Sequence, residues 1–184
     1  MGLVVTIGGP HGTGKSTYAK MIAKQLKLRY ISAGKMFRDL AKEKGLSLEE
    51  LSRQAAESPE IDNLIDERSA VEAAKGNAVI EGQLAAWMAK DSAHVRIYVR
   101  ASDEARIGRI ARRDHLDYET ARTQTVEREK IQRDRYKRYY GINIDDLTPY
   151  NIIVDTTDRS VESTSAELMS KIRHILNRDR SAEV

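Results

Sequence analysis

The residues with the clearest chemical potential form one glycine-rich stretch near the start of the chain. Residues 9–16 read Gly-Pro-His-Gly-Thr-Gly-Lys-Ser and fit the pattern Gly-x-x-x-x-Gly-Lys-[Ser/Thr] at every position. Glycines let the backbone curl so that successive N–H groups point at phosphate oxygens, Lys15 adds a mobile cation, and the Ser16 hydroxyl can bind Mg²⁺. This chemistry predicts a nucleoside triphosphate site. Its predicted residues are Gly8, Gly9, Pro10, His11, Gly12, Thr13, Gly14, Lys15, Ser16 and Thr17.

Positive charge is concentrated in one third of the chain. The 31 Lys and Arg residues against 28 Asp and Glu residues give a formal net charge of +3, which is too small to indicate nucleic-acid binding. Residues 106–138 are nevertheless unusually rich in arginine. Two interpretations stay open. The segment could be a solvated helix face with many ion pairs, which is the interpretation favoured when charge is the only evidence, or it could be a site for an anionic ligand.

The phosphate loop lies between a predicted strand and a predicted helix, which is the setting that the motif requires. Short β-branched runs alternate with helical spacing of apolar residues along the rest of the chain. Strands are predicted at residues 3–7, 29–31, 78–80, 95–99 and 151–155, and helices from Lys15, at 36–44, from a capping box at 47–50, at 59–75, 102–113, 118–140 and 163–177. This alternation predicts an α/β fold with a parallel sheet covered on both faces.

Length and composition narrow the class of protein. One domain over residues 1–184 is expected, because ~100 to 200 residues is the usual domain size. The absence of cysteine excludes disulfides, thiolate metal sites and cysteine nucleophiles, and four His argue against a zinc site. No apolar run approaches the ~18 to 20 residues of a membrane span, and no secretory signal is evident. We therefore expect a cytoplasmic protein without membrane contact, and a monomer by default.

Three classes of phosphate-loop protein compete for this sequence. GTP switches read guanine with an Asn-Lys-x-Asp element, which the sequence lacks, and ATP-driven motors are usually larger. A kinase that phosphorylates a small acceptor fits the length and the arginine-rich segment, because several guanidinium groups must hold two anionic substrates. The third class is therefore favoured.

Further motifs carry a family resemblance. The phosphate loop together with residues 31–38 (Ile-Ser-Ala-Gly-Lys-Met-Phe-Arg) resembles the nucleoside monophosphate kinases, and the likeness extends to residues 79–82, the arginine-rich segment and residues 155–157. Glu-Gly-x-Leu-Ala-x-Trp ending at Trp87, and residues 135–146, make the sequence most similar to the cytidylate kinases of the short, archaeal type. The resemblance implies a three-layer P-loop kinase fold with a five-stranded parallel sheet. It also implies a monophosphate-binding segment at about 33–75 and a lid with its lid-side helix at about 109–138.

The resemblance assigns roles to individual side chains. It implies that Arg38, with Ser32 and Gly34, binds the acceptor phosphate, and that Glu81 holds Mg²⁺ together with Ser16. It also implies that Arg109, Arg128 and Arg135 act with Lys15 on the phosphates, and that Gln132 contacts the cytosine. The spacing of seven puts Arg128 and Arg135 on one helix face. For Arg112 and Arg113, a solvated position and a functional role remain equally open.

Three departures from the family pattern concern acceptor and metal binding. Glu81 stands where most of the superfamily has Asp, which lengthens the reach by one methylene group. Gln83 lies close to where related kinases often carry an acceptor-binding Arg. Gln132 replaces an Asp that accepts from the cytosine amine in bacterial cytidylate kinases, and an amide can both accept and donate.

The reaction implied by the resemblance is transfer of the ATP γ-phosphoryl group to CMP, and also dCMP, giving ADP and CDP or dCDP. Residues 114–117 are expected to close over ATP and residues 36–75 over the monophosphate. Two alternatives stay open: a related kinase with AMP, UMP or a small alcohol as acceptor, and an ATP-binding module whose helix at 118–140 contacts protein or RNA. The partners expected are therefore small nucleotides rather than nucleic acid.

The remaining candidates have a structural interpretation that is favoured over a functional one. Tyr136, Tyr139 and Tyr140 could stack on a base, but packing of a helix end against the sheet is the favoured interpretation, and the same holds for Trp87. His11 occupies a variable position of the phosphate loop, where we expect an exposed side chain.

Overall fold

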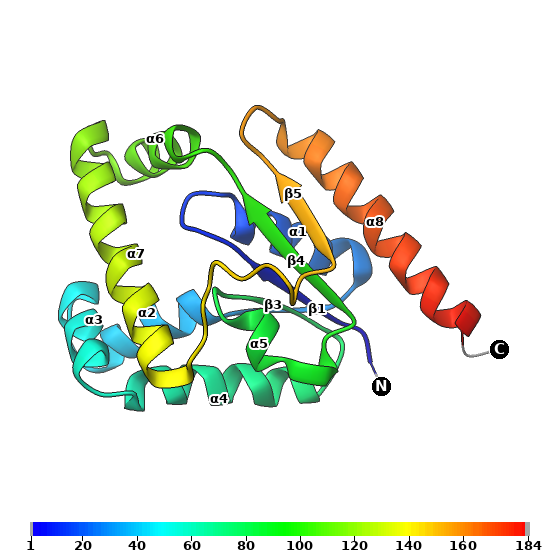
Figure 1. Cartoon of the computed structure of the whole chain (residues 1–184), viewed down its shortest axis with the longest axis horizontal. Coiled ribbons are helices and arrows are strands. Elements are labelled where there is room, and N and C mark those ends of the chain that lie inside the picture. Colours follow the sequence, from blue (N-terminus) through cyan, green and yellow to red (C-terminus); the bar gives the residue numbers. More distant parts are fainter. Residues whose placement is uncertain (1, 183–184) are drawn as a thin grey trace.

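The computed structural model describes residues 2–182, apart from the side chains of residues 90 and 179–182. Its centre is a five-stranded sheet in the order β2-β3-β1-β4-β5, in which all neighbouring strands are parallel (Figure 1). The strands are β1 (Val4–Gly8), β2 (Arg29–Ser32), β3 (Ala78–Glu81), β4 (Val95–Arg100) and β5 (Ile152–Asp155). The predicted α/β fold is confirmed, and every predicted strand is present within one residue or so of its expected bounds.

The helices alternate with the strands, as the apolar spacing predicts. They are α1 (Lys15–Leu26), α2 (Ala33–Glu43), α3 (Leu48–Glu57), α4 (Glu60–Ala74), α5 (Ala85–Met88), α6 (Asp103–Asp114), α7 (Tyr118–Tyr140) and α8 (Val161–Ala182), with a 3₁₀ turn at Lys90–Ser92. The predicted capping box is present, since the Ser47 hydroxyl accepts from the Glu50 N–H and the Glu50 carboxylate accepts from the Ser47 N–H. Within residues 2–182 no helix is long and apolar enough to cross a membrane.

Two apolar layers cover the two faces of the sheet. On one face, Val5 and Ile7 of β1 pack with α1 and α8 through Ile22 and Leu168. On the other face, Val4 packs with the buried alanines of α4 and α5. Alternate residues of β1 thus enter different clusters, because successive side chains of a strand point to opposite faces. Because the alternating side chains make both faces of the sheet apolar, helices cover both faces, which gives the three-layer arrangement predicted for a P-loop kinase.

Two helix predictions need correction, and one short helix was not predicted. The helix predicted at 36–44 begins at Ala33, because the Ser32 hydroxyl accepts from the Lys35 N–H at 3.2 Å and so caps an earlier turn. The last helix covers Val161–Ala182 rather than 163–177. The short α5 has no counterpart among the predictions, since four residues are too few to show a helical period.

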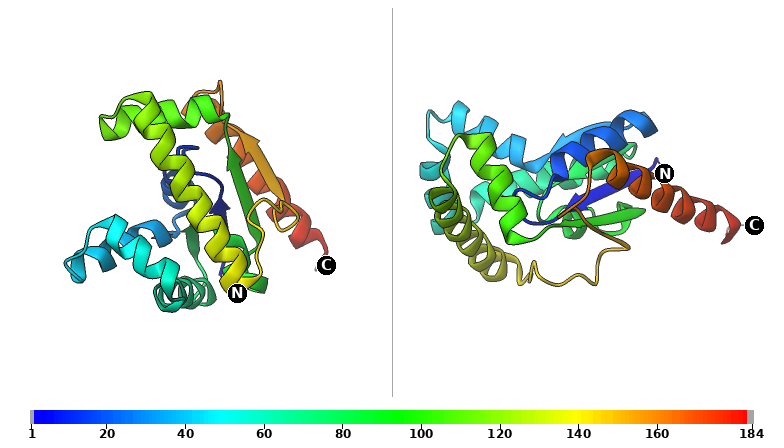
Figure 2. Two further views of the ribbon diagram at one scale, coloured as in Figure 1. Left: turned by 60° about the vertical axis from the view of Figure 1, so that its left-hand side comes forward. Right: turned by 90° about the horizontal axis from the view of Figure 1, so that it is seen from above.

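Helix α7 spans the molecule along the carboxyl ends of the strands (Figure 2). Its N-terminal part packs on α6, and its C-terminal part lies against α3 and α4, where the Tyr139 hydroxyl donates to the Ala56 carbonyl at 2.8 Å. The segment 33–75 contains α2, α3 and α4, whereas 109–138 falls on α6 and α7. The two segments expected to enclose the substrates are therefore in contact, because α7 of the second segment packs against α3 of the first.

Candidate active site

The phosphate loop is held in its curled form by close backbone packing. Gly9 has φ 133° and lies so close to β4 that a Cβ atom there would meet the Val99 carbonyl oxygen at 2.0 Å. Gly12 has φ 79° and packs against the backbone of Arg106 at the start of α6, where a Cβ would lie 2.3 Å from the carbonyl oxygen. Side chains are excluded at both positions. The loop ends at Gly14, and α1 begins at the next residue. The unpaired backbone N–H groups at the N-terminus of this helix favour the binding of a phosphate group.

Lys15 lies at the base of this loop with 9% of its surface exposed. Its ammonium group donates to the Pro10 carbonyl at 2.5 Å. Burial lowers the pKa of Lys15 to about 8, against the raising effect of the Glu81 and Glu129 carboxylates. Lys15 thus remains a cation at neutral pH and is placed where phosphate oxygens would enter.

Glu81 is the centre of a hydroxyl cluster at the carboxyl end of β3. Its Oε1 accepts from the Ser16 hydroxyl at 3.0 Å, and its Oε2 accepts from the hydroxyls of Ser32 at 2.7 Å and Tyr30 at 2.8 Å. The parallel register pairs Glu81 with Ile7 of β1 and with Ser32 of β2, which brings the ends of three strands together. The predicted metal-binding pair, Ser16 and Glu81, is therefore adjacent, whereas Tyr30 was not predicted.

The oxygen donors of Ser16 and Glu81 fit a magnesium ion. Mg²⁺ prefers oxygen ligands at about 2.0–2.1 Å in an octahedron, so two neighbouring ligand oxygens lie about 3.0 Å apart. The Ser16 and Glu81 oxygens have this separation. Among the side chains that the structure describes, no group of three or more His, Cys, Asp or Glu could hold a metal ion. A magnesium ion here would share its coordination with nucleotide phosphates, which is its usual mode of binding.

Further cationic side chains face the same space. The guanidinium group of Arg38 lies over Gly34, where a Cβ would be 3.5 Å from its Nη1 atom. Arg128 is exposed on α7, and its charge contributes, after burial, to the lowered pKa of both His11 and Lys15. The structure thus brings Lys15, Arg38 and Arg128 around the mouth of the phosphate loop. Within the arginine-rich segment, this arrangement favours the anion-binding interpretation for Arg128.

Comparison with known proteins places this geometry in a family. The model of the cytidylate kinase-like family matches residues 4–158. The chain belongs to the cytidylate kinase-like family. The resemblance read from the phosphate loop, the segment 31–38 and the Trp87 motif is therefore confirmed.

Curated relatives in this family are similar along almost their whole length. The chain is 48% identical to a cytidylate kinase of Staphylothermus marinus over 162 residues, which cover 88% of this chain and 92% of the relative. It is 50% identical to a cytidylate kinase of Aeropyrum pernix over 158 residues, or 86% and 92% of the two chains. A cytidylate kinase of Methanocaldococcus jannaschii is 40% identical over 94% of this chain and 99% of its own.

Solved structures share the fold at low sequence identity. A gluconokinase from Sinorhizobium meliloti superimposes with a TM-score of 0.65 at 12% identity, covering 100% of this chain and 98% of that one. A shikimate kinase from Bacteroides thetaiotaomicron gives 0.62 at 12% identity, covering 93% and 98%. These likenesses show the P-loop kinase fold of the cytidylate kinase-like family and nothing of its acceptor.

Two arginines with predicted roles in this family bind protein groups in the structure. Arg109 donates to the Thr156 hydroxyl at 3.0 Å and to the Thr156 and Thr157 carbonyls, which ties α6 to the loop after β5. Arg135 forms an ion pair with Asp62 of α4 at 2.6 Å, and both side chains are at most 6% exposed. Neither guanidinium group joins Lys15 and Arg128 in this conformation, so their phosphate-binding roles stay predictions.

His11 is not the exposed loop residue that was expected. Its ring is partly buried, and its Nε2 lies 2.8 Å from Oε1 of Gln132 and 3.3 Å from Nε2 of Gln83. Burial, reinforced by the charges of Arg128 and Lys15, lowers the pKa of His11 to about 3. The expectation failed because α7 crosses over the loop and covers this position, a contact between residues 121 apart in the chain.

The tyrosines near the end of α7 support the packing interpretation, but with a different partner. Tyr136 is buried, and Tyr140 donates to the Asn63 side chain of α4 at 3.2 Å. The helix end thus packs against α3 and α4 rather than against the sheet. Trp87 likewise packs edge-on against Tyr150, with ring centroids 5.6 Å apart.

The remaining arginines of α6 engage local groups. Arg113 forms an exposed ion pair with Asp114, and Arg112 donates to the Gly108 carbonyl one turn back. These local contacts favour the interpretation that both arginines belong to a solvated helix face.

One buried ion pair beside the loop was missed. Arg106 of α6 lies 2.8 Å from Glu129 of α7, with side chains 7% and 13% exposed, and Glu129 also accepts from the His11 N–H at 3.1 Å. The position of Glu129, next to Arg128 and three residues before Gln132, offered a signal, because residues three apart share a helix face. Arg106 offered none beyond its place at the start of the arginine-rich segment.

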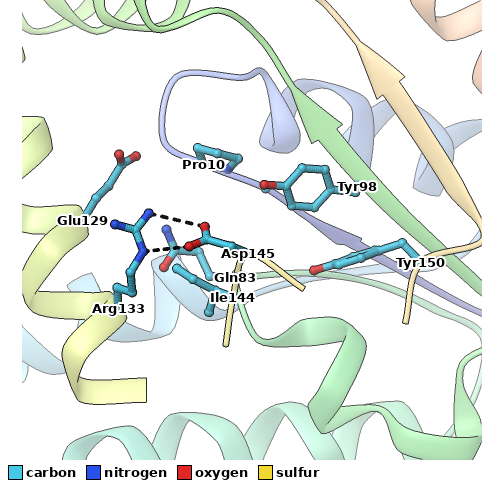
Figure 3. A pocket seen from close by; sticks show the side chains of 9 residues that line it. Pro10, Gln83, Tyr98, Glu129, Arg133, Ile144, Asp145 and Tyr150 are labelled. Carbon is cyan, nitrogen blue, oxygen red and sulfur yellow. Dashed lines mark hydrogen bonds and ion pairs between the residues drawn. The ribbon is translucent and has the colours of Figure 1, made fainter. Parts of the chain in front are cut away.

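A small cavity lies between the phosphate loop, α7 and the segment that leads to β5. It has a volume of about 40 Å³ and is lined in part by Pro10, Gln83, Tyr98 and Glu129. Figure 3 shows that the ion pair between Arg133 of α7 and Asp145 flanks it. A cavity of this size has room for a few water molecules.

Proposed function

We propose that this chain transfers the γ-phosphoryl group of ATP to CMP and dCMP, giving ADP and CDP or dCDP. The observation that carries the proposal is the assembled donor site in a member of the cytidylate kinase-like family, with the Ser16 hydroxyl 3.0 Å from Glu81 and the Lys15 ammonium group held at the base of the phosphate loop by the Pro10 carbonyl. Relatives that are 48% and 50% identical over most of both chains carry the name cytidylate kinase, which supports CMP as the acceptor.

The donor nucleotide would be held by the phosphate loop. Backbone N–H groups of residues 12–17 and the ammonium group of Lys15 are the groups suited to the β and γ phosphates. Ser16 and Glu81 would hold the Mg²⁺ that accompanies ATP, directly or through water, and this ion supplies charge neutralisation on the phosphates. Thr13 and Thr156, joined at 3.1 Å, fix the loop next to Arg109 on the nucleotide side.

The acceptor would enter between the phosphate loop and α2–α4. Arg38 above Gly34 is the group proposed to bind its phosphate, with Ser32 at the same edge, while Gln132 of α7 faces the acceptor from the other side. The acceptor phosphate is already an anion, so no strong general base is required. Catalysis would come from in-line positioning and from Lys15 and Arg128 stabilising charge on the transferring group.

The proposed reaction requires water to be kept from the phosphoryl group, since water would otherwise accept it. The lid turn at residues 114–117 and the helices α2–α4 are the segments proposed to close over the two substrates. Helix α7 contacts both segments and the loop itself, so its inner face is engaged within the molecule. For this reason no binding role of α7 toward protein or RNA is proposed, and monomeric state and cytoplasmic location stay predictions.

A coupled ADP-release assay tests the function. The chain is supplied with ATP and Mg²⁺ and, in parallel, with CMP, dCMP, UMP, AMP, GMP or no acceptor. A clear preference for CMP and dCMP is expected. Equal rates with AMP or UMP would support the activity of a nucleoside monophosphate kinase but contradict CMP as the preferred acceptor. ADP release without an acceptor, at the same rate as with one, would contradict phosphoryl transfer to any monophosphate.

A further inference from the structure

One side chain of the phosphate loop joins three elements around the acceptor side of the site. His11 is the third residue of the loop, and its ring contacts Gln132 of α7 at 2.8 Å and Gln83, which follows β3, at 3.3 Å. Both glutamines occupy positions where the sequence departs from the family pattern. Pro10, Gln83 and Glu129 lie together around the small cavity between the loop and α7 (Figure 3).

The proton on the ring determines how the Gln132 amide is turned. A neutral imidazole carries one N–H, and Oε1 of Gln132 can only accept a hydrogen bond. Nε2 of His11 lies 2.8 Å from this oxygen, so it donates to Gln132 in the tautomer that carries the hydrogen on Nε2. In that tautomer Nε2 cannot also accept from the Gln83 amide nitrogen 3.3 Å away, so the Gln83 approach is a packing contact without a hydrogen bond. The carbonyl oxygen of Gln132 is then occupied, which leaves the Gln132 NH₂ group to face a ligand. Burial and the neighbouring charges of Arg128 and Lys15 keep the ring in its neutral form.

Gln83 carries the group that this network leaves unsatisfied. Its Oε1 atom is buried and has no hydrogen-bond partner within the described structure. A buried amide oxygen without a partner costs free energy until a donor reaches it. A substrate group or a water molecule in the adjoining cavity of about 40 Å³ would supply that donor.

The backbone of His11 makes a separate link to the same helix. Its N–H donates to Glu129, which is also paired with Arg106. This link does not depend on the side chain at position 11. Substitutions of His11 can therefore remove the imidazole contacts while the attachment of the loop to α7 is retained.

We propose that His11 is a positioning residue for the nucleotide acceptor, because its ring turns the Gln132 amide so that the NH₂ group donates to the substrate. Ring nitrogen N3 is an acceptor in cytosine but carries a proton in uracil, so a donating amide favours CMP over UMP. This assignment differs from the pattern in bacterial cytidylate kinases, where an Asp at the position of Gln132 accepts from the cytosine amine. The inference rests on the proposed function and names the group that sets its selectivity.

Steady-state kinetics of His11→Ala, His11→Gln and His11→Phe with CMP and UMP test the inference. For His11→Ala we expect the ratio of kcat/KM for CMP over UMP to fall about tenfold, the effect of one hydrogen bond, through KM for CMP. ATP binding should change less than twofold, since the loop backbone is unaltered. His11→Gln should restore the ratio because its side-chain amide places an N–H near the position of Nε2, whereas His11→Phe fills the space without a donor and should not.

Two further variants separate positioning from general loop packing. His174→Ala, an exposed histidine on α8, serves as the matched control and should leave all constants unchanged. The double variant His11→Ala/Gln132→Ala should resemble Gln132→Ala alone, because both substitutions remove the same contact. Urea unfolding of each variant shows whether the fold is intact.

Three results would overturn the inference. They are an unchanged CMP to UMP ratio in His11→Ala, full selectivity in His11→Phe, or equal losses in ATP and CMP binding. Failure of the proposed function looks different, because the wild-type chain itself would then show no preference for CMP.

Discussion

The hydroxyl of Ser16 lies 3.0 Å from Oε1 of Glu81. This hydrogen bond joins the first turn of α1, the helix that follows β1, to the end of the neighbouring strand β3. The contact exists because β1 and β3 are neighbours in parallel register and therefore end together. Open α/β sheets bind ligands at the carboxyl ends of their strands. The donor site of this kinase is accordingly a product of sheet topology as much as of the phosphate-loop motif.

Removal of the Lys15 ammonium group should abolish most of the activity. In Lys15→Ala, kcat/KM is expected to fall about 10²- to 10³-fold, the usual loss for one preorganised donor to a developing charge. Steady-state kinetics with ATP and CMP measure this, with Lys24→Ala on the exposed face of α1 as the matched control. Activity within threefold of the wild type would exclude the role of Lys15.

The carboxylate of Glu81 should set the magnesium requirement. Glu81→Gln keeps the size of the side chain but removes its charge, so the Mg²⁺ concentration for half-maximal rate should rise about tenfold or more. A titration of rate against Mg²⁺ measures the shift, and Glu162→Gln on α8 provides a control far from the site. An unaltered titration curve for Glu81→Gln would show that the ion does not depend on this carboxylate.

Arg128 should act on the transition state more than on substrate binding. Loss of a charged hydrogen-bond donor in Arg128→Ala is expected to lower kcat about 10- to 100-fold, with a smaller rise in KM. Arg122→Ala, an exposed arginine earlier on α7, is the control for charge and helix position. A normal kcat combined with a raised KM would assign Arg128 to ground-state binding instead.

The lowered pKa of Lys15 predicts a pH dependence. Burial lowers this pKa to about 8, so the cationic form is present below pH 8 and is lost as pH rises through it. Because kcat/KM reports ionisations of the free enzyme, kcat/KM for ATP should decline above about pH 8. The profile of kcat should decline at higher pH, since bound phosphates favour the cation. Coincident profiles would contradict this assignment.

The ion pair of Arg135 and Asp62 should contribute to folding. Arg135→Ala leaves the Asp62 carboxylate buried without its partner, which is expected to cost about 3–5 kcal/mol of unfolding free energy. Urea unfolding measures the loss. The double variant Arg135→Met/Asp62→Asn should recover most of it, because no buried charge remains. An unfolding free energy close to that of the wild type in Arg135→Ala would instead indicate that Arg135 is free for substrate.

The features that the sequence predicts well are those with local causes. The curl of the phosphate loop, the cap at Ser47 and the alternation of β1 between two apolar layers all depend on residues close together in the chain. The proximity of Ser16 and Glu81 could also be predicted, because parallel strands that end at one edge of a sheet bring the residues at and after their ends together.

What the sequence could not show depends on where α7 lies. Nothing local to His11 indicates that Gln132, far along the chain, covers it, and nothing near Arg135 indicates Asp62 as its partner. The start of α2 at Ala33 was missed for a smaller reason, since Ser32 was considered as a substrate ligand and not as a cap.

The most direct test of the central claim is to follow the transferred group itself. The chain is incubated with Mg²⁺, CMP and ATP labelled in its γ-phosphoryl group, and the nucleotides are separated by chromatography. Phosphoryl transfer to CMP predicts label in CDP, with ADP formed in equal amount and little labelled inorganic phosphate. Label that passes to inorganic phosphate alone, or that never leaves ATP, would contradict phosphoryl transfer to CMP.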